Sequence, residues 1–390
     1  MSPTPMGFAD PTQPAGYSWE ATDEDVAARY GIPIERIVRF DVNTAPTPPA
    51  FVERLLRAGR FGPSLSEYPP TDYRRLVEAA AARYGVGTDE LIVGAGADEI
   101  LDIITKTFLP PGGAAVVPTP TYAMYRVDTE QRPGRVVAVP RLGAAEGYAL
   151  DLPAVRVAAA DPDVAIVWLC DPNNPTATQE PDGAIETLLG WLDDDAAGRG
   201  EAPPVVVIDE AYAEFVGRSH LGLRDRYPRL IVIRTASKAY ALAGLRVGFG
   251  IARPELIARM NPYRPPGSIS TVSVSLVTAA LEDPDVLTDN LARVVAERAR
   301  FGAALAGLGW DAGPSVTNFV LVRLDSREHA AFIAEALLAA GLVPRTFGAD
   351  HPLADHLRLT VRATDENDRF IEVARTAEAA WRVHATGVDR

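Results

Sequence analysis

Short apolar runs separated by polar turns recur along the first two thirds of the chain. The clearest of them contain no polar residue and lie at Leu91–Val93, Val164–Cys170, Val205–Ile208 and Leu230–Ile233. Such continuous runs are typical of strands that are buried on both faces of a parallel sheet. Longer amphipathic segments alternate with them, for example Tyr73–Tyr84. The pattern therefore predicts an α/β fold, in which a mostly parallel central sheet is flanked by helices.

The pattern changes after the loop Pro265–Ser268. Helical periodicity at Val272–Leu281 and Val286–Leu308 predicts two helices, of which the second is long and amphipathic. Beyond Trp310, shorter strands and helices alternate and predict a smaller α/β unit. We therefore expect a segment that forms an N-terminal arm and packs on the small domain, a large domain, and a small C-terminal domain, at residues 1–47, 48–285 and 286–390.

Two stretches lack a regular pattern. Residues 1 to about 22 contain four prolines and little apolar periodicity, which favours a mobile arm. Asp193–Pro204 mixes acidic residues, glycine and proline, and this composition favours a surface loop before the next strand.

Composition narrows the class of protein. The net charge of −14 argues against nucleic acid or an anionic membrane as a partner, and no run of 18 apolar residues suggests a membrane span. The single cysteine, Cys170, excludes an intramolecular disulfide and suits a reducing cytoplasm. No basic and apolar secretory leader is visible at the N-terminus. The five histidines have no metal-ligand spacing, so we expect no metal site.

A lysine follows one of the apolar runs. Lys238 lies just past Leu230–Ile233, at the strand end where an α/β sheet gathers its ligand groups. Lysine forms Schiff bases when its surroundings lower its pKa. Thr235, Ser237 and Arg246 lie nearby in the sequence, and such donors suit a phosphate monoester. The stretch thus indicates a site for pyridoxal 5′-phosphate (PLP), an aldehyde that carries a phosphate, with a solvated surface lysine as the ordinary alternative.

Two further strand ends carry polar residues. Asp209 and Tyr212 follow Val205–Ile208, and Asn174 follows Val164–Cys170. An aspartate at this place pairs with a protonated pyridine nitrogen, which keeps the ring an electron sink. Tyr212 and Asn174 offer donors to the phenolic oxygen of the same ring. A helix cap for Asp209 and a simple turn at Asn174 remain the plainer interpretations.

A small-residue turn opens the helix that we expect at Ile100–Phe108. Gly96, Ala97 and Asp98 leave backbone N–H groups accessible at a helix N-terminus, which favours a phosphate. A dinucleotide fingerprint needs a third glycine where Glu99 stands, so a nicotinamide site is disfavoured. Tyr122 follows the next strand and offers an aromatic face to a pyridine ring, or else belongs to the core.

With these residues in place, the chain resembles fold-type I PLP enzymes of the class I/II aminotransferases, and most closely the histidinol-phosphate aminotransferases. The resemblance covers roughly residues 25 to 380 and rests on segments in the family's order, namely YPPTDYRRL, GAGADEIL, PTYAMY, CDPNNPT, VVVIDEAYAEF, TASKAYALAGLRVGFG, TNFVLVRL and HLRLTV. It implies the aspartate-aminotransferase-like fold, PLP as cofactor and a homodimer.

The resemblance also implies roles for single residues. Lys238, Asp209 and Tyr212 are the expected catalytic residues. The expected cofactor-binding residues are Tyr68 (reaching from the neighbouring subunit), Gly96, Ala97, Asp98, Tyr122, Asn174, Asp209, Tyr212, Thr235, Ser237, Lys238 and Arg246. The expected substrate contacts are Asn43, Arg345 for a phosphate and Arg358 for a carboxylate.

Some positions depart from the family's pattern. Thr44 and Ala45 stand where N-E-N-P has its glutamate and second asparagine, and Arg362 stands where V-G-T has glycine. Ala177 replaces the glycine of N-P-T-G, so an alanine must adopt a backbone shape that glycine supplies more easily. The first three changes lie on the substrate side of the expected site.

The implied activity is transfer of an amino group between an amino acid or a histidinol-phosphate-like amino alcohol and a 2-oxo acid. Decarboxylation of an amino-acid phosphate, or action on aromatic or specialised metabolites, remains an alternative. A PLP-binding regulator is disfavoured, because no basic, helix-turn-helix-like segment precedes residue 25.

Overall fold

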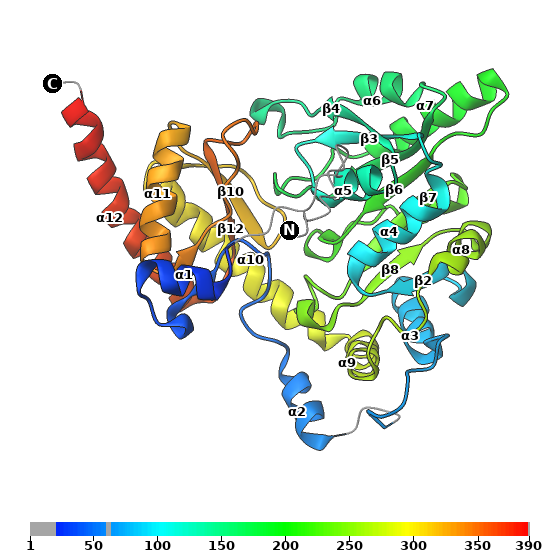
Figure 1. Cartoon of the computed structure of the whole chain (residues 1–390), viewed down its shortest axis with the longest axis horizontal. Coiled ribbons are helices and arrows are strands. Elements are labelled where there is room, and N and C mark those ends of the chain that lie inside the picture. Colours follow the sequence, from blue (N-terminus) through cyan, green and yellow to red (C-terminus); the bar gives the residue numbers. More distant parts are fainter. Residues whose placement is uncertain (1–20, 60–63, 389–390) are drawn as a thin grey trace, which may run out of the picture.

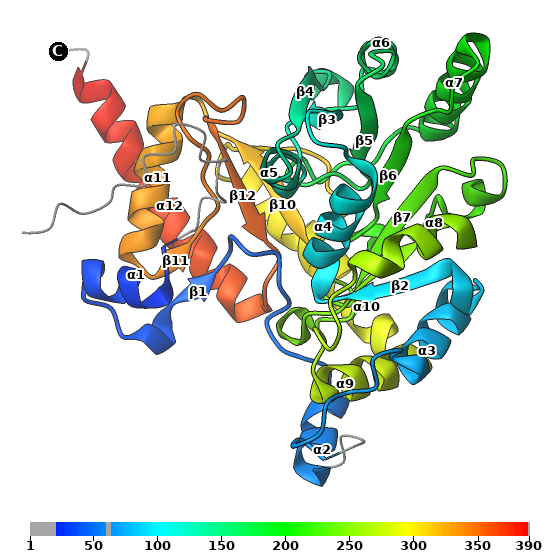
Figure 2. The same cartoon turned by 45° about the vertical axis from the view of Figure 1, so that its right-hand side comes forward.

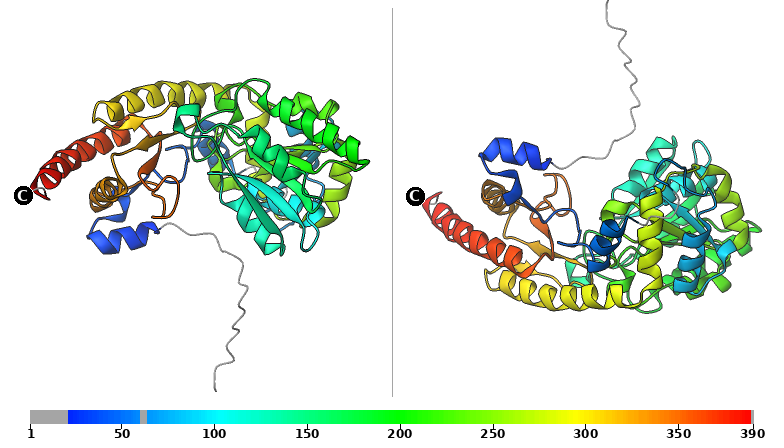
Figure 3. Two further views of the ribbon diagram at one scale, coloured as in Figure 1. Left: turned by 90° about the horizontal axis from the view of Figure 1, so that it is seen from above. Right: turned by 90° about the horizontal axis from the view of Figure 1, so that it is seen from below.

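The computed structural model describes residues 21–59 and 64–388 of the 390-residue chain. Its two α/β units are joined by the long helix α10 (Asp285–Ala306), which runs from one unit to the other (Figure 1, Figure 3). The expected mobile arm at residues 1 to about 22 lies almost wholly outside the described residues. In the described part of the chain, no helix has both the length and the apolarity needed to cross a membrane.

The larger unit is built on a seven-stranded sheet with the strand order β2-β8-β7-β6-β5-β3-β4. All neighbouring strands pair in parallel except β8, which is antiparallel to β7 and β2. The predicted mostly parallel α/β architecture is thereby confirmed. The strands are β2 (Leu91–Gly94), β3 (Ala114–Thr119), β4 (Arg135–Pro140), β5 (Val164–Cys170), β6 (Val205–Asp209), β7 (Leu230–Thr235) and β8 (Gly248–Ile251).

Helices cover both faces of this sheet, which explains why its strands are apolar without interruption. In β7, Ile231 and Ile233 face a cluster with α4 (Gly96–Phe108), α5 (Met124–Gln131) and α8 (Pro254–Met260). Leu230 and Val232 face the opposite cluster with α6 (Leu152–Ala159) and α7 (Ala184–Arg199). Each such buried side chain contributes about 2 kcal/mol through removal from water, so the central strands anchor the sheet.

A third group of helices covers the β2 edge of the sheet. Helix α3 (Arg74–Tyr84) packs on α9 (Thr271–Glu282), and α2 (Ala50–Ala58) lies below them (Figure 2). Their apolar side chains join those of β2 and β8 in one cluster, which also contains Ala236 and Ala239 on either side of Lys238.

The smaller unit has a three-stranded antiparallel sheet of β9 (Asp311–Ala312), β10 (Phe319–Arg323) and β12 (His356–Thr360), in the order β12-β10-β9. Helices α10, α11 (Arg327–Ala339) and α12 (Thr364–Val388) pack on it. The N-terminal segment joins this unit, because β1 (Val38–Arg39) pairs with β11 (Leu342–Val343) and α1 (Asp23–Tyr30) packs on α11. This pairing fixes the chain just before the loop 41–46. The division at residues 47 and 285 stays a prediction.

The predicted surface loop at Asp193–Pro204 is wrong over its first half. Helix α7 continues to Arg199, because Leu188, Leu192 and Ala196 recur at helical spacing and bury one face of it. The acidic residues lie on the outer face of the helix, and the helix ends at Gly200, whose φ of 70° is left-handed. Composition alone concealed this periodicity. Helix α4 likewise begins at Gly96, four residues before the predicted start at Ile100.

Candidate active site

A cavity of about 270 Å³ lies at the carboxyl ends of β5, β6 and β7, where the two units meet. Such strand ends are the usual ligand site of an open α/β sheet. The residues that the sequence predicted and that line this cavity are Asn43, Ala97, Asp98, Tyr122, Asn174, Asp209, Tyr212, Thr235, Ser237, Lys238, Arg246 and Arg358.

Lys238 extends into the cavity from the turn that follows β7. Its Nζ lies 3.3 Å from the main-chain oxygen of Asn43 and 5.9 Å from the centroid of the Tyr212 ring. Burial lowers the pKa of Lys238 to about 8, and the nearby positive charge of Arg358 acts in the same direction. About one tenth of the amine is therefore unprotonated at pH 7, far more than for an ordinary lysine, and this neutral form is the one that attacks a carbonyl carbon.

Asp209 ends β6 and is buried below the cavity. Its Oδ2 accepts a hydrogen bond of 2.8 Å from Tyr125 Oη, and its Oδ1 accepts one of 3.0 Å from the backbone N–H of Ala211. Burial raises the pKa of Asp209 to about 6, even though these hydrogen bonds oppose the shift. A buried carboxylate of this kind is stabilised by a cation placed beside it, such as a protonated ring nitrogen.

Tyr125 was missed by the sequence analysis. Its ring stacks on Trp168 of β5, with centroids 5.4 Å apart and an interplanar angle of 6°, so its hydroxyl is fixed under Asp209. Tyr125 lies three residues after Tyr122, just inside α5, and the two rings contact edge to face with centroids 5.8 Å apart. That spacing was the available signal.

The first turn of α4 forms the anion-binding side of the cavity. Arg246 Nη2 lies 3.0 Å from Asp98 Oδ2, and Tyr122 Oη donates to Asp98 Oδ1 at 2.9 Å. Gly96 does not line the cavity but lies behind Arg246, since a Cβ at this position would come within 2.4 Å of the Arg246 Nη2. Gly96 also has a φ of 86°, which favours glycine.

Two hydroxyl groups complete this side. Thr235 Oγ1 donates to Ser237 Oγ at 2.9 Å, and both side chains are buried. Together with Arg246 and the exposed N–H groups of α4, they offer several donors within one region. This donor set fits a phosphate monoester.

Arg358 reaches the opposite side of the cavity from β12. Its Nη1 donates to Asn174 Oδ1 at 2.6 Å and its Nη2 donates to the main-chain oxygen of Asp41. Because Arg358 occupies the oxygen of Asn174, the amide NH₂ is the group of Asn174 that remains to donate to a ligand. Asn174 belongs to a loop that also contains Ala177, whose φ of 63° is the glycine-like conformation expected from the sequence.

Besides Gly96, two further predicted site residues lie outside the cavity. The side chain of Tyr68 is at the surface, where the residue is 91 % exposed. Arg345 is half-buried and pairs through its backbone with Arg358 in an antiparallel bridge. Residues directly opposite in such a pair project from the same face, so the side chains of Arg345 and Arg358 leave the backbone on one side.

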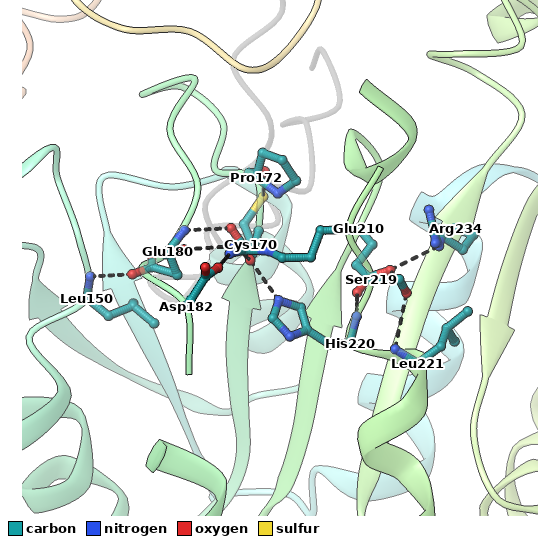
Figure 4. A network of polar contacts seen from close by, with 12 residues as sticks. Leu150, Cys170, Pro172, Glu180, Asp182, Glu210, Ser219, His220, Leu221 and Arg234 are labelled. Atoms are coloured by element: carbon teal, nitrogen blue, oxygen red, sulfur yellow. Dashed lines mark hydrogen bonds and ion pairs between the residues drawn. The ribbon is translucent and has the colours of Figure 1, made fainter. Parts of the chain in front are cut away.

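A network of ion pairs and hydrogen bonds lies behind the strand ends (Figure 4). Asp171 Oδ2 accepts from Arg218 Nη2 at 2.9 Å and from His220 Nε2 at 2.7 Å. Glu210 accepts from the backbone N–H of His220 and from Ser219 Oγ at 2.7 Å. Asp171 and Glu210 directly follow β5 and β6, so residues 218–220 connect the two strand ends that carry Asn174 and Asp209. Neither composition nor spacing pointed to this network.

Over residues 21–59 and 64–388, histidine, cysteine, aspartate and glutamate form no group of three or more that is placed to hold a metal ion.

A lysine amine that burial keeps partly neutral is suited to condense with a carbonyl compound. A carbonyl compound that carries a phosphate and a basic ring nitrogen would fit the donors at α4 and the buried carboxylate of Asp209. These requirements define the class as the PLP-dependent enzymes of fold type I.

The comparisons with known proteins agree. The model of the family "Aminotransferase class I and II" matches residues 37–373. A histidinol-phosphate aminotransferase of Roseiflexus castenholzii is 35% identical over 90% of this chain and 92% of its own. One from Xanthomonas campestris pv. campestris is 39% identical over 81% of this chain and 86% of its own. The chain therefore belongs to the class I and II aminotransferase family, as the motifs predicted.

A solved structure shows the same fold. Histidinol-phosphate aminotransferase from Sinorhizobium meliloti, in complex with pyridoxal-5′-phosphate, superimposes with a TM-score of 0.83 at 24% identity, over 93% of this chain and 96% of that chain. The predicted aspartate-aminotransferase-like architecture is thereby confirmed.

Proposed function

We propose that this aminotransferase uses a phosphorylated amino alcohol of the histidinol-phosphate type as amino donor and a 2-oxo acid as acceptor. The observation that carries the proposal is the antiparallel backbone bridge between Arg345 and Arg358, because residues directly opposite each other in such a pair project from the same face. A single arginine can bind a carboxylate through its planar fork. A second arginine beside it provides the additional donors that a phosphate group needs. The names of the relatives described above support the same donor.

The cofactor is pyridoxal 5′-phosphate, as the sequence predicted. It supplies an electron sink that stabilises negative charge at the α-carbon of the donor. Asp209 keeps the ring nitrogen protonated, because the buried carboxylate gains most from a cation beside it. The neutral Nζ of Lys238 would be the group that bonds to the aldehyde carbon of the cofactor, and the free amine would be the base that accepts the proton of the donor's α-carbon.

The remaining residues of the site would hold the cofactor and orient it. Tyr212 and Asn174 would donate to the phenolic oxygen of the cofactor, and Tyr122 would pack against its ring. The phosphate would be held by the turn of Gly96, Ala97 and Asp98, by Thr235, Ser237 and Arg246, and by Tyr68 of a second subunit. The exposure of Tyr68 supports a homodimer in which this side chain is covered. We also infer that the enzyme is cytoplasmic.

The departures at Thr44 and Arg362 leave this proposal intact. Arg362 forms an ion pair of 3.0 Å with Glu366 and its Nη1 lies 3.5 Å from the main-chain oxygen of Thr44. The positive charge of Arg362 is therefore compensated by a carboxylate, and its side chain ties the loop 43–45 to the small unit. It does not add an uncompensated cation to the substrate side.

A panel of amino donors with 2-oxoglutarate as acceptor tests the proposal. We expect turnover of histidinol phosphate at a kcat/KM at least tenfold above that of histidinol, phenylalanine and aspartate, with no release of CO₂. The Arg345→Ala variant should lose this preference for the phosphorylated donor. Equal use of histidinol and its phosphate would refute the donor assignment, and CO₂ release from an amino-acid phosphate would establish the decarboxylase instead. Lys238→Ala is the inactive control.

A further inference from the structure

Asn43 lies where the N-terminal segment, the large unit and the small unit meet. Its backbone N–H donates to Thr360 Oγ1 at 2.9 Å, and its main-chain oxygen accepts from Asn318 Nδ2 at 2.9 Å. The same oxygen lies 3.3 Å from Lys238 Nζ. Its side-chain Nδ2 donates to Tyr212 Oη at 3.0 Å. Each backbone polar group of this residue therefore already has a partner in the protein.

The side chain is committed as well. Asn43 is 2 % exposed, its Nδ2 is held by Tyr212, and its Oδ1 lies 3.4 Å from Thr360 Oγ1. The sequence suggested a substrate contact for Asn43, which stays a prediction, whereas the contacts described here support a different role. We infer that Asn43 is a positioning residue, which fixes the hydroxyl of Tyr212 for the cofactor and does not itself hold the substrate.

The physical basis is the direction of the hydrogen bond. By donating to Tyr212 Oη, Asn43 occupies an acceptor site of that oxygen and leaves the phenol proton to be donated elsewhere. Burial raises the pKa of Tyr212, whereas Arg358 and the hydrogen bond from Asn43 lower it. Cys170 and Asp209 raise the pKa further, and the Lys238 amine faces the ring. The hydroxyl thus stays protonated, and the bond from Asn43 makes it a better donor to an anionic oxygen.

This inference rests on PLP as cofactor but not on the identity of the amino donor. A donor to the phenolic oxygen stabilises the form of the bound cofactor in which that oxygen is negative. The pKa of the bound chromophore, read from its absorbance, therefore reports the strength of the Tyr212 hydrogen bond without any turnover.

The backbone of Asn43 makes a clean substitution available. Its φ is 53°, a left-handed conformation that glycine adopts freely. Asn43→Gly removes the amide and leaves the backbone contacts with Thr360, Asn318 and Lys238 in place. Tyr212→Phe removes the hydroxyl on which the amide acts, so the two variants and their double variant form a double-mutant cycle.

We expect Asn43→Gly to raise the chromophore pKa by about half a unit to one unit, the worth of one hydrogen bond. It should lower kcat about tenfold and leave the KM of the amino donor within about twofold, since no substrate contact is lost. In the Tyr212→Phe background the same change should move the chromophore pKa by less than about 0.2 units. Should the glycine variant not fold, Asn43→Ala removes the same amide without adding a charge, and it enters the same cycle.

Two results would overturn the inference. One is a rise of tenfold or more in donor KM with an unchanged chromophore pKa, which would make Asn43 a substrate ligand. The other is an equal pKa shift with and without the Tyr212 hydroxyl, which would mean that Asn43 acts by another route. Because the titration needs no amino donor, failure of the donor assignment leaves this test intact.

Discussion

Replacing Asp209 by asparagine separates the stability of the empty protein from its capacity to bind the cofactor. In the cofactor-free protein, burial raises the pKa of Asp209 from 3.8 to about 6. A shift of about two units corresponds to about 3 kcal/mol of free energy of unfolding. Between about pH 4 and pH 6 the folded state binds the proton that the unfolded state has released, so stability falls as the pH rises. Above about pH 6, where Asp209 is ionised in both states, its burial lowers the free energy of unfolding by the full amount.

Asparagine has nearly the same shape and carries no charge. We therefore expect the cofactor-free Asp209→Asn protein to be more stable than the parent at pH 8, by about 2 kcal/mol after about 1 kcal/mol is allowed for the altered hydrogen bond with Tyr125. For a chain of this size, the melting temperature should rise by about 2 °C. At pH 4 the advantage should vanish, because the parent carboxyl group is then protonated.

The assay is thermal unfolding of both proteins at pH 4 to 8, with and without PLP. Addition of PLP should reverse the order at pH 8, since only the parent gains the pairing of a carboxylate with a ring cation. Asp171→Asn is the control, because Asp171 is an equally buried carboxylate that already pairs with Arg218 and His220, and its loss should destabilise at pH 8. A difference between Asp209→Asn and the parent that does not change with pH would refute the reasoning.

Three further perturbations test other parts of the site. The rate at which the protein captures PLP should rise about tenfold per pH unit below about pH 8 and level off above it, because the pKa of Lys238 is about 8 and only the neutral amine reacts. Stopped-flow absorbance measures this rate, and a rate that does not change with pH would contradict the prediction. Glu180→Ala should lower the free energy of unfolding by about 3 kcal/mol or more, because it removes the carboxylate that pairs with the buried Arg141 at 2.6 Å. Glu53→Ala, which removes an exposed ion pair with Arg57, should lower it by less than about 0.5 kcal/mol, and denaturant unfolding measures both. Arg358→Lys should raise the KM of the 2-oxo acid about tenfold or more in steady-state kinetics, because an ammonium cannot replace the planar fork; an unchanged KM would remove Arg358 from the substrate.

The candidate site was largely predictable, because its chemistry sits at strand ends. Lys238, Asp209 and Asn174 each follow an apolar run, and parallel strands bring their carboxyl ends to one edge of a sheet. The expected glycine-like shape of Ala177 was also correct, since its φ is 63°. The local sequence and the topology of a parallel sheet together were therefore enough to predict where these site residues lie.

Contacts between distant side chains were not predictable. Tyr125 reaches Asp209 over 84 positions of sequence, and Asn43 reaches Tyr212 over 169. Such partners depend on the exact direction of side chains after the two units have packed, which no periodicity encodes. The extension of α7 through Arg199 was missed for a different reason, because three consecutive aspartates hid the apolar face of the helix.

The central claim is that Lys238 is the amine that holds the cofactor, and the chain offers a built-in control. It contains two lysines, Lys238 and Lys106, and Lys106 pairs with Asp102 on the exposed side of α4. Borohydride reduction of the PLP-loaded protein, followed by proteolysis and mass spectrometry, distinguishes them. Our account predicts one reduced pyridoxyl group per chain, on the peptide that contains Lys238. Recovery of the group on Lys106, or no covalent group at all, would contradict it.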